Sequence, residues 1–403
     1  MATLSGSSQI NSDLEDVRRK PMKPTPYSPK DFARHPLMFY YEVTQACDLV
    51  CRHCRASAQS GPRPDELSPE QSQALIRQIA SFDRKPVLVL TGGDPLKRRD
   101  IFDLIRYART CGLEVALTPS ATPLATREAL SRAKEAGIRR LGFSLDGPDA
   151  ATHDAFRGWS GSFDRTLEML HDAKEIGLPV QINTSITPRN VSQIDAMAEL
   201  LAQTGIVMWS VFFLVPVGRG HAEQRISPEA YESVFEQLWN HSRHQPYAIK
   251  TTEAPHYRRW VLQHQGVKDP SVGTEAPLQA TGRHAPDVGH RAPLGVRDGN
   301  GIMFVSYNGV IYPAGFLPVE CGRFPDQSVV EAYRHHPAFV ALREPDQFEG
   351  KCGVCEFRQV CGGSRSRAYG VTGNMLASEP DCVYQPASWT NNASRSGSLV
   401  NHR

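Results

Sequence analysis

Residues 42–54 read EVTQACDLVCRHC and place three cysteines on one short loop, directly after the apolar segment 38–43 (MFYYEV). The spacing is Cys47-x3-Cys51-x2-Cys54. Three thiolates on a tight loop can hold three corners of a cubane 4Fe–4S cluster, which leaves the fourth iron open for a small molecule to chelate. A structural zinc ion is the alternative, but zinc prefers four ligands, and the ring of His53, the local fourth candidate, is expected to point away from the cysteines. The loop therefore predicts an iron–sulfur cluster with an open iron.

Apolar segments with the residue types of β-strands alternate with helical segments along most of the first half of the chain. The expected strands are 38–43, 87–90, 113–117, 141–145, 180–186 and 207–215. One helix is expected to begin after Ser68, with Gln71 placed for a capping box, and others to end at Gly112, Gly137, Gly177 and Gly205. This alternation predicts a parallel sheet with right-handed crossovers. Since six units are too few for an eight-stranded barrel, we expect an α/β fold with a partial (β/α)6 TIM-type barrel, its chemistry at the C-terminal ends of the strands.

Composition and periodicity divide the chain into regions. They are a disordered tail (1–34), the barrel (35–245), a helical segment and linker (246–300), a small C-terminal iron–sulfur cluster domain (301–386) and a second disordered tail (387–403). The C-terminal domain is expected to begin with a hairpin that turns at Asn308-Gly309 and to contain a helix near residues 328–343.

The bulk composition is that of an ordinary globular protein of 403 residues, 40% hydrophobic and 22% charged. A formal charge of +2 is too small to favour nucleic acid or a membrane surface as the partner, and the chain has no apolar run long enough to span a bilayer. The N-terminal segment lacks the apolar region of a secretory signal. Nine cysteines, most of them in two groups at ligand-like spacing, favour metal chemistry in a reducing cytoplasm over a disulfide framework.

A second cysteine group lies near the C-terminus, where Cys352-x2-Cys355-x5-Cys361 is followed by a more distant Cys382. Four thiolates suffice for either a closed zinc site or a fully ligated iron–sulfur cluster, and the spacing alone leaves both open. The two cysteines outside these groups, Cys111 and Cys321, are expected to be buried apolar thiols.

With the three-cysteine loop after the first strand of a βα series, residues 36–220 resemble the radical S-adenosylmethionine (SAM) superfamily. The resemblance implies that SAM chelates the open iron. It also implies that one electron, from a donor such as flavodoxin or ferredoxin, cleaves SAM to methionine and a 5′-deoxyadenosyl radical. That radical removes a hydrogen atom from the substrate. The motifs assign no side chain of the protein to this catalytic step.

Further segments resemble SAM-contacting motifs of the superfamily. TGGDPL (91–96) is similar to the motif that contacts the methionyl amino group, although the family more often has Glu in place of Asp94. SLDG (144–147) matches a region near the SAM ribose, and Arg157 matches a residue that helps to hold the SAM carboxylate. On the residues alone, the two glycines also suit a plain βα turn, and Arg157 a surface ion pair. The implied SAM contacts are Gly92, Gly93, Asp94, Pro95, Ser144, Asp146, Arg157 and Asn183, with a weaker one in VPVGRG (215–220).

The C-terminal cysteine group resembles the SPASM/twitch extension of radical SAM enzymes, which carries auxiliary 4Fe–4S clusters. Its cysteines match the ligands of the second auxiliary cluster. Arg365 stands where a full SPASM domain has another cysteine, and the YPAG segment (312–315) also lacks an expected one. The resemblance therefore implies one auxiliary cluster, held by Cys352, Cys355, Cys361 and Cys382.

Three segments narrow the resemblance to the branch that includes haem-biosynthesis enzymes: LTPSATPL (117–124), YPAGFLP (312–318) and CGVCEFRQVCGGSRSRAYG (352–370). The implied substrate is a tetrapyrrole whose side chains are oxidatively modified. Arg358, Arg365 and Arg367 are candidates to pair with its carboxylates, or equally to offset the charge of an anionic cluster or to face solvent. Two alternatives stay open, a maturase of a ribosomally made peptide and a non-catalytic zinc-binding scaffold.

Overall fold

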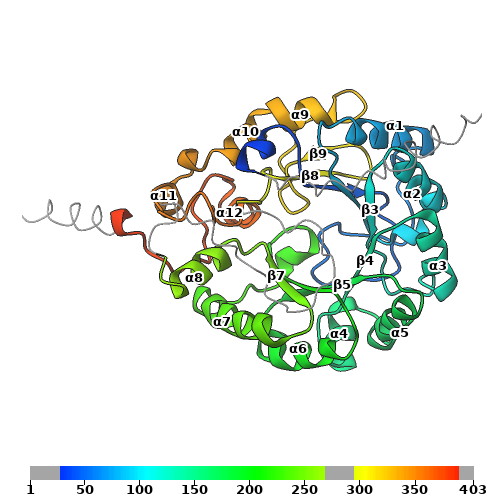
Figure 1. Ribbon diagram of the computed structural model, residues 1–403, viewed down its shortest axis with the longest axis horizontal. Coiled ribbons are helices and arrows are strands. Elements are labelled where there is room, and N and C mark those ends of the chain that lie inside the picture. Colours follow the sequence, from blue (N-terminus) through cyan, green and yellow to red (C-terminus); the bar gives the residue numbers. More distant parts are fainter. Residues whose placement is uncertain (1–27, 268–294, 390–403) are drawn as a thin grey trace, which may run out of the picture.

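The computed structural model describes residues 28–267 and 295–389, which form one nine-stranded sheet surrounded by helices (Figure 1). The strand order is β7-β6-β5-β4-β3-β2-β1-β8-β9, and all neighbours are parallel except β8 and β9. The strands are β1 (Met38–Glu42), β2 (Val87–Thr91), β3 (Glu114–Leu117), β4 (Arg140–Ser144), β5 (Val180–Ile186), β6 (Met208–Phe213), β7 (Ala248–Thr252), β8 (Ile302–Val305) and β9 (Ile311–Tyr312). Because β7 and β9 lie at opposite ends of this order, the sheet forms the open, partial α/β barrel that the sequence predicts.

Local signals predict the helix boundaries. Ser68 and Gln71 form the expected capping box at the start of α1, and Gly112, Gly137, Gly177 and Gly205 all have positive φ after their helices. The α-helices are α1 (Pro69–Ala80), α2 (Ile101–Thr110), α3 (Arg127–Ala136), α4 (Ala150–Arg157), α5 (Ser162–Glu175), α6 (Ile194–Ala202), α7 (Pro228–His244), α8 (His256–His264), α9 (Val329–His335), α10 (Pro337–Arg343), α11 (Gly350–Gly353) and α12 (Arg365–Thr372). Short 3-10 helices are η1 (Pro29–Ala33), η2 (Pro95–Lys97), η3 (Val191–Gln193), η4 (Gly218–Ala222) and η5 (Pro345–Gln347).

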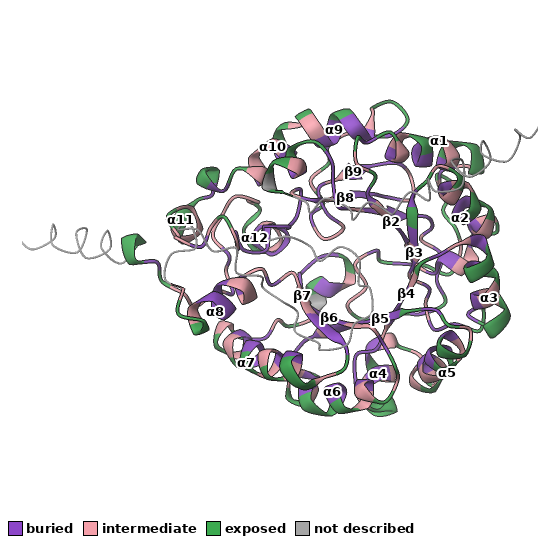
Figure 2. Ribbon diagram, viewed as in Figure 1, coloured by how far each residue is buried: buried purple, intermediate pink, exposed green. Residues whose placement is uncertain are grey.

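The main core lies between the sheet and the helices, where Figure 2 shows the buried inner sides of the outer helices. Strand β5 illustrates the division, because its residues alternate strictly between buried and partly exposed. Val180, Ile182 and Ile186 join the main core, while Gln181 and Asn183 face the barrel interior. The interior of the barrel is therefore lined by a different set of residues from the core that stabilises it.

Three details of the sequence prediction were wrong. Residues 246–300 are more than a helical segment and linker, because β7 extends the sheet beside β6, and AIKTT is too short and polar to signal a strand. The hairpin at Asn308-Gly309 is present, but its strand β8 pairs with β1, so the C-terminal region begins inside the same sheet. The helix expected near 328–343 is two helices, since His336 is extended before Pro337.

The predicted N-terminal tail ends earlier than expected. Residues 28–34 contain η1, whose Phe32 is fully buried beside Leu37 and Val296. Most of both predicted tails and much of the linker lie outside the described residues, so the remaining region boundaries stay predictions. Within the described ranges, no helix combines the length and apolar character that a membrane crossing requires.

Candidate functional site

The first cysteine loop leaves β1 and returns toward α1, with Cys47 and Cys51 buried and Cys54 partly exposed. Each sulfur has a hydrogen-bond donor. The backbone N–H of Leu49 lies 3.4 Å from Cys47 Sγ, and that of Ala58 lies 3.4 Å from Cys54 Sγ. Arg157 Nη1 lies 3.7 Å from Cys51 Sγ. Donors aimed at sulfur stabilise thiolates, so the loop fits an anionic iron–sulfur cluster.

The two glycines of TGGDPL bring the β2 end against this loop. The Gly93 N–H donates to Thr44 O at 2.8 Å, and the Asp94 N–H donates to Ala46 O at 2.7 Å. A Cβ on Gly93 would lie 2.4 Å from Ala46 O, and one on Gly92 would lie 2.3 Å from Thr44 O. Only glycine permits this approach of two backbones. These glycines therefore do more than form a plain βα turn, because their backbone contacts hold the cysteine loop in place.

The Asp94 carboxylate points into the protein. It accepts hydrogen bonds from Thr122 Oγ1 at 2.7 Å and from the Leu96 N–H at 3.1 Å, and Pro95 beside it is buried at the start of η2. Burial raises the pKa of this carboxyl group despite these donors. Any contact of this motif with SAM therefore falls to its backbone groups rather than to the Asp94 side chain.

A buried ion pair connects the β4 end to the cysteine loop. Asp146 is fully buried, accepts from the Ser185 N–H at 2.8 Å, and lies 2.5 Å from Arg157 Nη2. Burial alone would raise the pKa of Asp146, but the positive charge of Arg157 is the main effect that offsets burial and lowers that pKa. Arg157 thus bridges a carboxylate and the Cys51 sulfur, so it is not the surface ion pair considered from the sequence.

His53 faces away from the thiols, as expected. Its ring packs edge-on against Phe156 with centroids 5.4 Å apart, and its Nε2 lies 3.7 Å from Asp146 Oδ2. Burial lowers the pKa of His53 to about 4, so the imidazole is neutral at physiological pH. His53 therefore supports the Asp146 ion pair rather than completing a zinc site.

Ser144 and Asn183 lie side by side as register partners on β4 and β5. Both side chains are partly exposed toward the barrel interior, and Asn183 Oδ1 accepts from Gln181 Nε2 at 2.7 Å. The structure thus places these two predicted contacts on one wall of the barrel, near the strand ends.

The VPVGRG segment holds the cysteine loop from a second side. Arg219 Nε donates to Cys51 O at 2.8 Å, and Arg219 Nη1 donates to Ala58 O at 2.8 Å. A Cβ on Gly218 would lie 2.5 Å from Cys54 O. Sequence reasoning missed the anchoring role of Arg219, because only the Gly-Arg-Gly pattern after a strand signals it.

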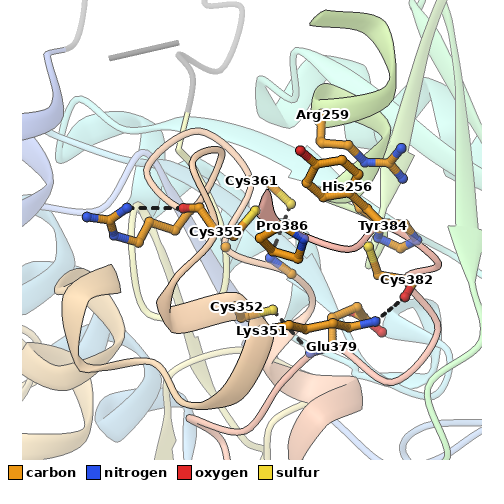
Figure 3. Close-up of a pocket in the computed structure, with 13 residues that line it drawn as sticks. His256, Arg259, Lys351, Cys352, Cys355, Cys361, Glu379, Cys382, Tyr384 and Pro386 are labelled. Atoms are coloured by element: carbon orange, nitrogen blue, oxygen red, sulfur yellow. Dashed lines mark hydrogen bonds between the residues drawn. The ribbon is translucent and has the colours of Figure 1, made fainter. Parts of the chain in front are cut away.

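The C-terminal thiols meet in one pocket (Figure 3). Cys352, Cys355, Cys361 and Cys382 line it together with His256, Arg259, Lys351 and Glu379. The Gly363 N–H lies 3.4 Å from Cys361 Sγ, and the Glu379 N–H lies 3.3 Å from Cys352 Sγ. Burial raises the pKa of the Cys355 thiol to about 12, so these sulfurs need nearby positive charge in order to ionise.

The C-terminal arginines make their contacts within the protein. Arg365 and Arg367 are fully buried. Arg367 Nε donates to Glu379 Oε1 at 2.8 Å, and Arg365 Nη1 donates to Ala377 O at 2.6 Å while its Nη2 lies 3.8 Å from Cys352 Sγ. Arg358 pairs with Asp346 at 2.6 Å. The proposed pairing with substrate carboxylates is therefore wrong for Arg365 and Arg367, which are buried within the protein, while Arg358 lies in a partly exposed ion pair.

The remaining cysteines are structural. Cys321 is buried in the main core, and its sulfur donates to Val319 O at 3.4 Å. Cys111 caps α2 and packs against the same core. Cys321 matches the expectation of a buried apolar thiol, whereas Cys111 is only partly buried.

Comparison with known proteins agrees with this geometry. Residues 41–201 match the model of the radical SAM superfamily. The chain is 38% identical over 87% of its length to a protein of Methanosarcina barkeri called AdoMet-dependent heme synthase, 97% of which is covered. This chain belongs to the radical SAM superfamily. A protein of the same name from Nitratidesulfovibrio vulgaris is 37% identical over 87% of this chain and 93% of its own.

Membership of the radical SAM superfamily makes the chain an enzyme with a 4Fe–4S cluster and SAM, which needs a reductant and a substrate. The crystal structure of Streptococcus suis SuiB bound to precursor peptide SuiA has the same fold, with a TM-score of 0.67 over 88% of this chain and 78% of that one. The two sequences are only 16% identical, so this likeness concerns the fold alone. Because membership of the superfamily makes the chain an enzyme, the non-catalytic scaffold considered from the sequence is wrong.

Proposed function

We propose that this radical SAM enzyme oxidises a propionate side chain of a polycarboxylated tetrapyrrole. The observation that carries the proposal is the 38% identity, over 97% of its length, to a protein called AdoMet-dependent heme synthase. That match includes the C-terminal region as well as the barrel, so the likeness extends beyond the machinery that radical SAM enzymes share.

Cys47, Cys51 and Cys54 would hold the 4Fe–4S cluster, and SAM would bind beside them. Bound there, cluster and SAM supply a 5′-deoxyadenosyl radical that removes one hydrogen atom from the substrate. The backbone of Gly92–Pro95, which touches the cysteine loop, would meet the methionyl amino group. Arg157, beside the Cys51 sulfur, would meet the SAM carboxylate, while Ser144, Asp146 and Asn183 would lie near the ribose.

The substrate step can be written so that atoms and electrons balance. Loss of a hydrogen atom from the propionate carbon next to the ring leaves a radical beside the carbon that bears the carboxylate. The bond to the carboxylate then breaks, carbon dioxide leaves, a vinyl group forms and one electron is released. This electron needs an acceptor, and the second cysteine group is where we place one.

We propose that Cys352, Cys355, Cys361 and Cys382 bind a single auxiliary 4Fe–4S cluster, in a C-terminal unit of residues 301–386. Support comes from the four thiols lining one pocket and from backbone N–H groups aimed at two of them. The resemblance of this cysteine group to the auxiliary-cluster extension of radical SAM enzymes favours a 4Fe–4S cluster over a zinc ion.

The reductant is proposed to be a small electron carrier such as flavodoxin or ferredoxin, in a reducing cytoplasm. The second candidate function is maturation of a ribosomally made peptide, which the fold shared with peptide-bound SuiB favours. The two functions require different substrates to bind, a tetrapyrrole for the first and a precursor peptide for the second.

The deciding experiment incubates anaerobically reconstituted protein with SAM, dithionite and a panel of porphyrins and their iron complexes, followed by mass spectrometry. A mass loss of one carbon dioxide and two hydrogen atoms per side chain supports the proposal. No mass change across the panel, with turnover of a peptide instead, would replace it with the second function.

A further inference from the structure

The inner surface of the barrel has two unlike sides. Strands β4 and β5 present small polar side chains to the interior, among them Ser144, Asn183 and Ser185, and β2 ends there in Thr91. Strands β1, β8, β9 and β6 instead present aromatic rings. The polar side carries the proposed SAM contacts, so the aromatic side is left without a role in the function described above.

Three of the rings form a row across neighbouring strands. Tyr40 on β1 is the register partner of Phe304 on β8, and Phe304 is the register partner of Tyr312 on β9. All three point inward, because Tyr41, Met303 and Ile311, which alternate with them, lie in the main core. The Phe304 and Tyr312 ring centroids lie 6.2 Å apart. Side chains in one cross-strand row share a face of the sheet, so the row is continuous.

Two more rings extend this surface toward β6. Phe212 points inward from β6, since Val211 and Phe213 lie in the main core, and its centroid lies 6.1 Å from that of Phe316. Gly315 sits directly on Phe304, where a Cβ would lie 3.1 Å from the ring. We name the aromatic wall from these rings: Tyr40, Phe212, Phe304, Tyr312 and Phe316. All except Phe304 are partly exposed.

A cation joins the aromatic wall to the cysteine loop. Arg55 directly follows Cys54, and its guanidinium carbon lies 4.5 Å from the Phe304 ring centroid. Arg55 Nη2 donates to Glu42 Oε1 at 2.9 Å, and the side chain is 20% exposed. The guanidinium has five N–H donors in a fixed fork, so one carboxylate leaves several of them available to a second.

A second cation faces the interior from β7. Lys250 lies two residues before Thr252, the register partner of Phe212. Within the described residues, it makes no hydrogen bond or ion pair. Burial and the nearby Arg140 lower the pKa of Lys250 to about 8, which leaves the ammonium charged at neutral pH but without a counter-ion. A partly buried charge without a partner is unfavourable, and an anionic ligand would relieve it.

We propose that the aromatic wall binds the conjugated macrocycle of the substrate, and that Arg55 and Lys250 bind two of its carboxylates. A flat conjugated ring system makes offset and edge contacts with aromatic side chains, and guanidinium and ammonium groups bind carboxylates. The inference rests on the proposed function, since a tetrapyrrole with several propionates has this combination of a flat ring and spaced carboxylates. It names the residues that would select that substrate class.

The test uses the reconstituted full chain and a titration with iron coproporphyrin III, followed by the Soret-band shift. Phe316→Ala and Phe212→Ala should each raise the Kd on the order of tenfold by removing ring contact. Arg55→Gln and Lys250→Gln should do the same, and Arg55→Lys should recover part of the loss because the charge is kept. Iron content and far-UV circular dichroism of each variant verify that it folds and carries its clusters.

A matched pair of controls comes from outside the barrel. Arg132 lies over the Phe102 ring at 4.3 Å, a cation–π contact like that of Arg55 and Phe304 but between α2 and α3. Arg132→Gln and Phe102→Leu should leave the Kd unchanged. Wild-type Kd values in the wall variants, alongside normal turnover by the wild type, would overturn this inference and leave the proposed function standing. Failure of the wild type to bind any porphyrin would overturn the proposed function itself.

Discussion

The two thiol sites are built in opposite ways. At the first, three cysteines within eight residues lie on one loop, which is held by backbone contacts from Gly93 and by Arg219. At the second, Cys382 lies on a separate segment that follows Cys361, and it meets Cys352, Cys355 and Cys361 in a pocket. One loop can supply three ligands and leave a fourth position open, whereas converging segments supply four and close the site. The difference in construction therefore matches the proposed difference in chemistry, an open iron for SAM and a closed electron acceptor.

The largest expected effect breaks the open site. Cys51→Ala should reduce formation of 5′-deoxyadenosine from SAM and dithionite to background, because two thiolates cannot hold the cluster. Chromatography of the nucleoside products measures it. Cys111→Ala, at a helix end in the core, is the matched control and should cleave SAM normally. Wild-type cleavage by Cys51→Ala would show that the cluster lies elsewhere.

Breaking the closed site should have a different result. The wild type should contain about eight irons per chain, and the double variant Cys352→Ala/Cys355→Ala about four, since one cubane remains. We expect uncoupled SAM cleavage to continue in this variant while product formation stops. Metal analysis and product mass spectrometry decide the matter, and one equivalent of zinc with four irons in the wild type would contradict an auxiliary cluster.

The backbone contact at Gly93 sharpens the description of the first site. Gly93→Ala puts a Cβ 2.4 Å from Ala46 O, so the cysteine loop must shift. We expect a several-fold loss of iron from this site, measured with the second site disabled by the double variant. Gly61→Ala is the control, because a Cβ there meets nothing within 4 Å. Full iron occupancy in Gly93→Ala would mean that the loop adjusts without this contact.

Removal of the buried Asp146–Arg157 ion pair should lower the unfolding free energy more than it lowers the iron content. Arg157→Gln leaves Asp146 buried with its main counter-charge removed, which typically costs about 3–5 kcal/mol of unfolding free energy. The exposed pair of Arg34 and Asp83 is the control, and Arg34→Gln should cost about 1 kcal/mol or less. Urea unfolding of the cluster-free protein at pH 7 compares them. Equal effects of the two variants would contradict a structural role for the Asp146 pair.

The smallest effect is a pH dependence near that pair. His153 accepts from the Asp146 N–H at 2.9 Å, and burial, then Arg157, lower its pKa to about 4. Between the ordinary pKa of 6.5 and about 4, the unfolded chain binds a proton at this residue that the folded chain does not. Unfolding free energy should therefore fall as pH falls, by up to about 1.4 kcal/mol per pH unit from His153. His153→Gln should reduce the slope of unfolding free energy against pH by up to about 1.4 kcal/mol per pH unit, which corresponds to one proton. His335→Gln, at an exposed histidine, should leave this slope unchanged.

The sequence predicts well those features that depend on nearby residues. The capping box at Ser68, the glycine helix ends and the first six strands all follow from local spacing and periodicity, and the structure has them. The prediction fails at β7, where a short polar strand is stabilised by its pairing with β6 rather than by its own composition. It also fails at Arg365 and Arg367. The sequence suggests that these side chains can bind a substrate carboxylate, but in the structure they are buried among carbonyl and carboxylate groups of another segment.

The sequence by itself determined the three-cysteine loop, the strand–helix rhythm and the family resemblance, since each is written in residues that are close neighbours along the chain. The tertiary structure alone decided that β8 lies beside β1 and that aromatic rings of β1, β8 and β9 form one row. It also decided that Gly93 and Arg219 clamp the cysteine loop. Such contacts join residues far apart in the chain, and no local spacing specifies which distant backbone or ring will be their partner.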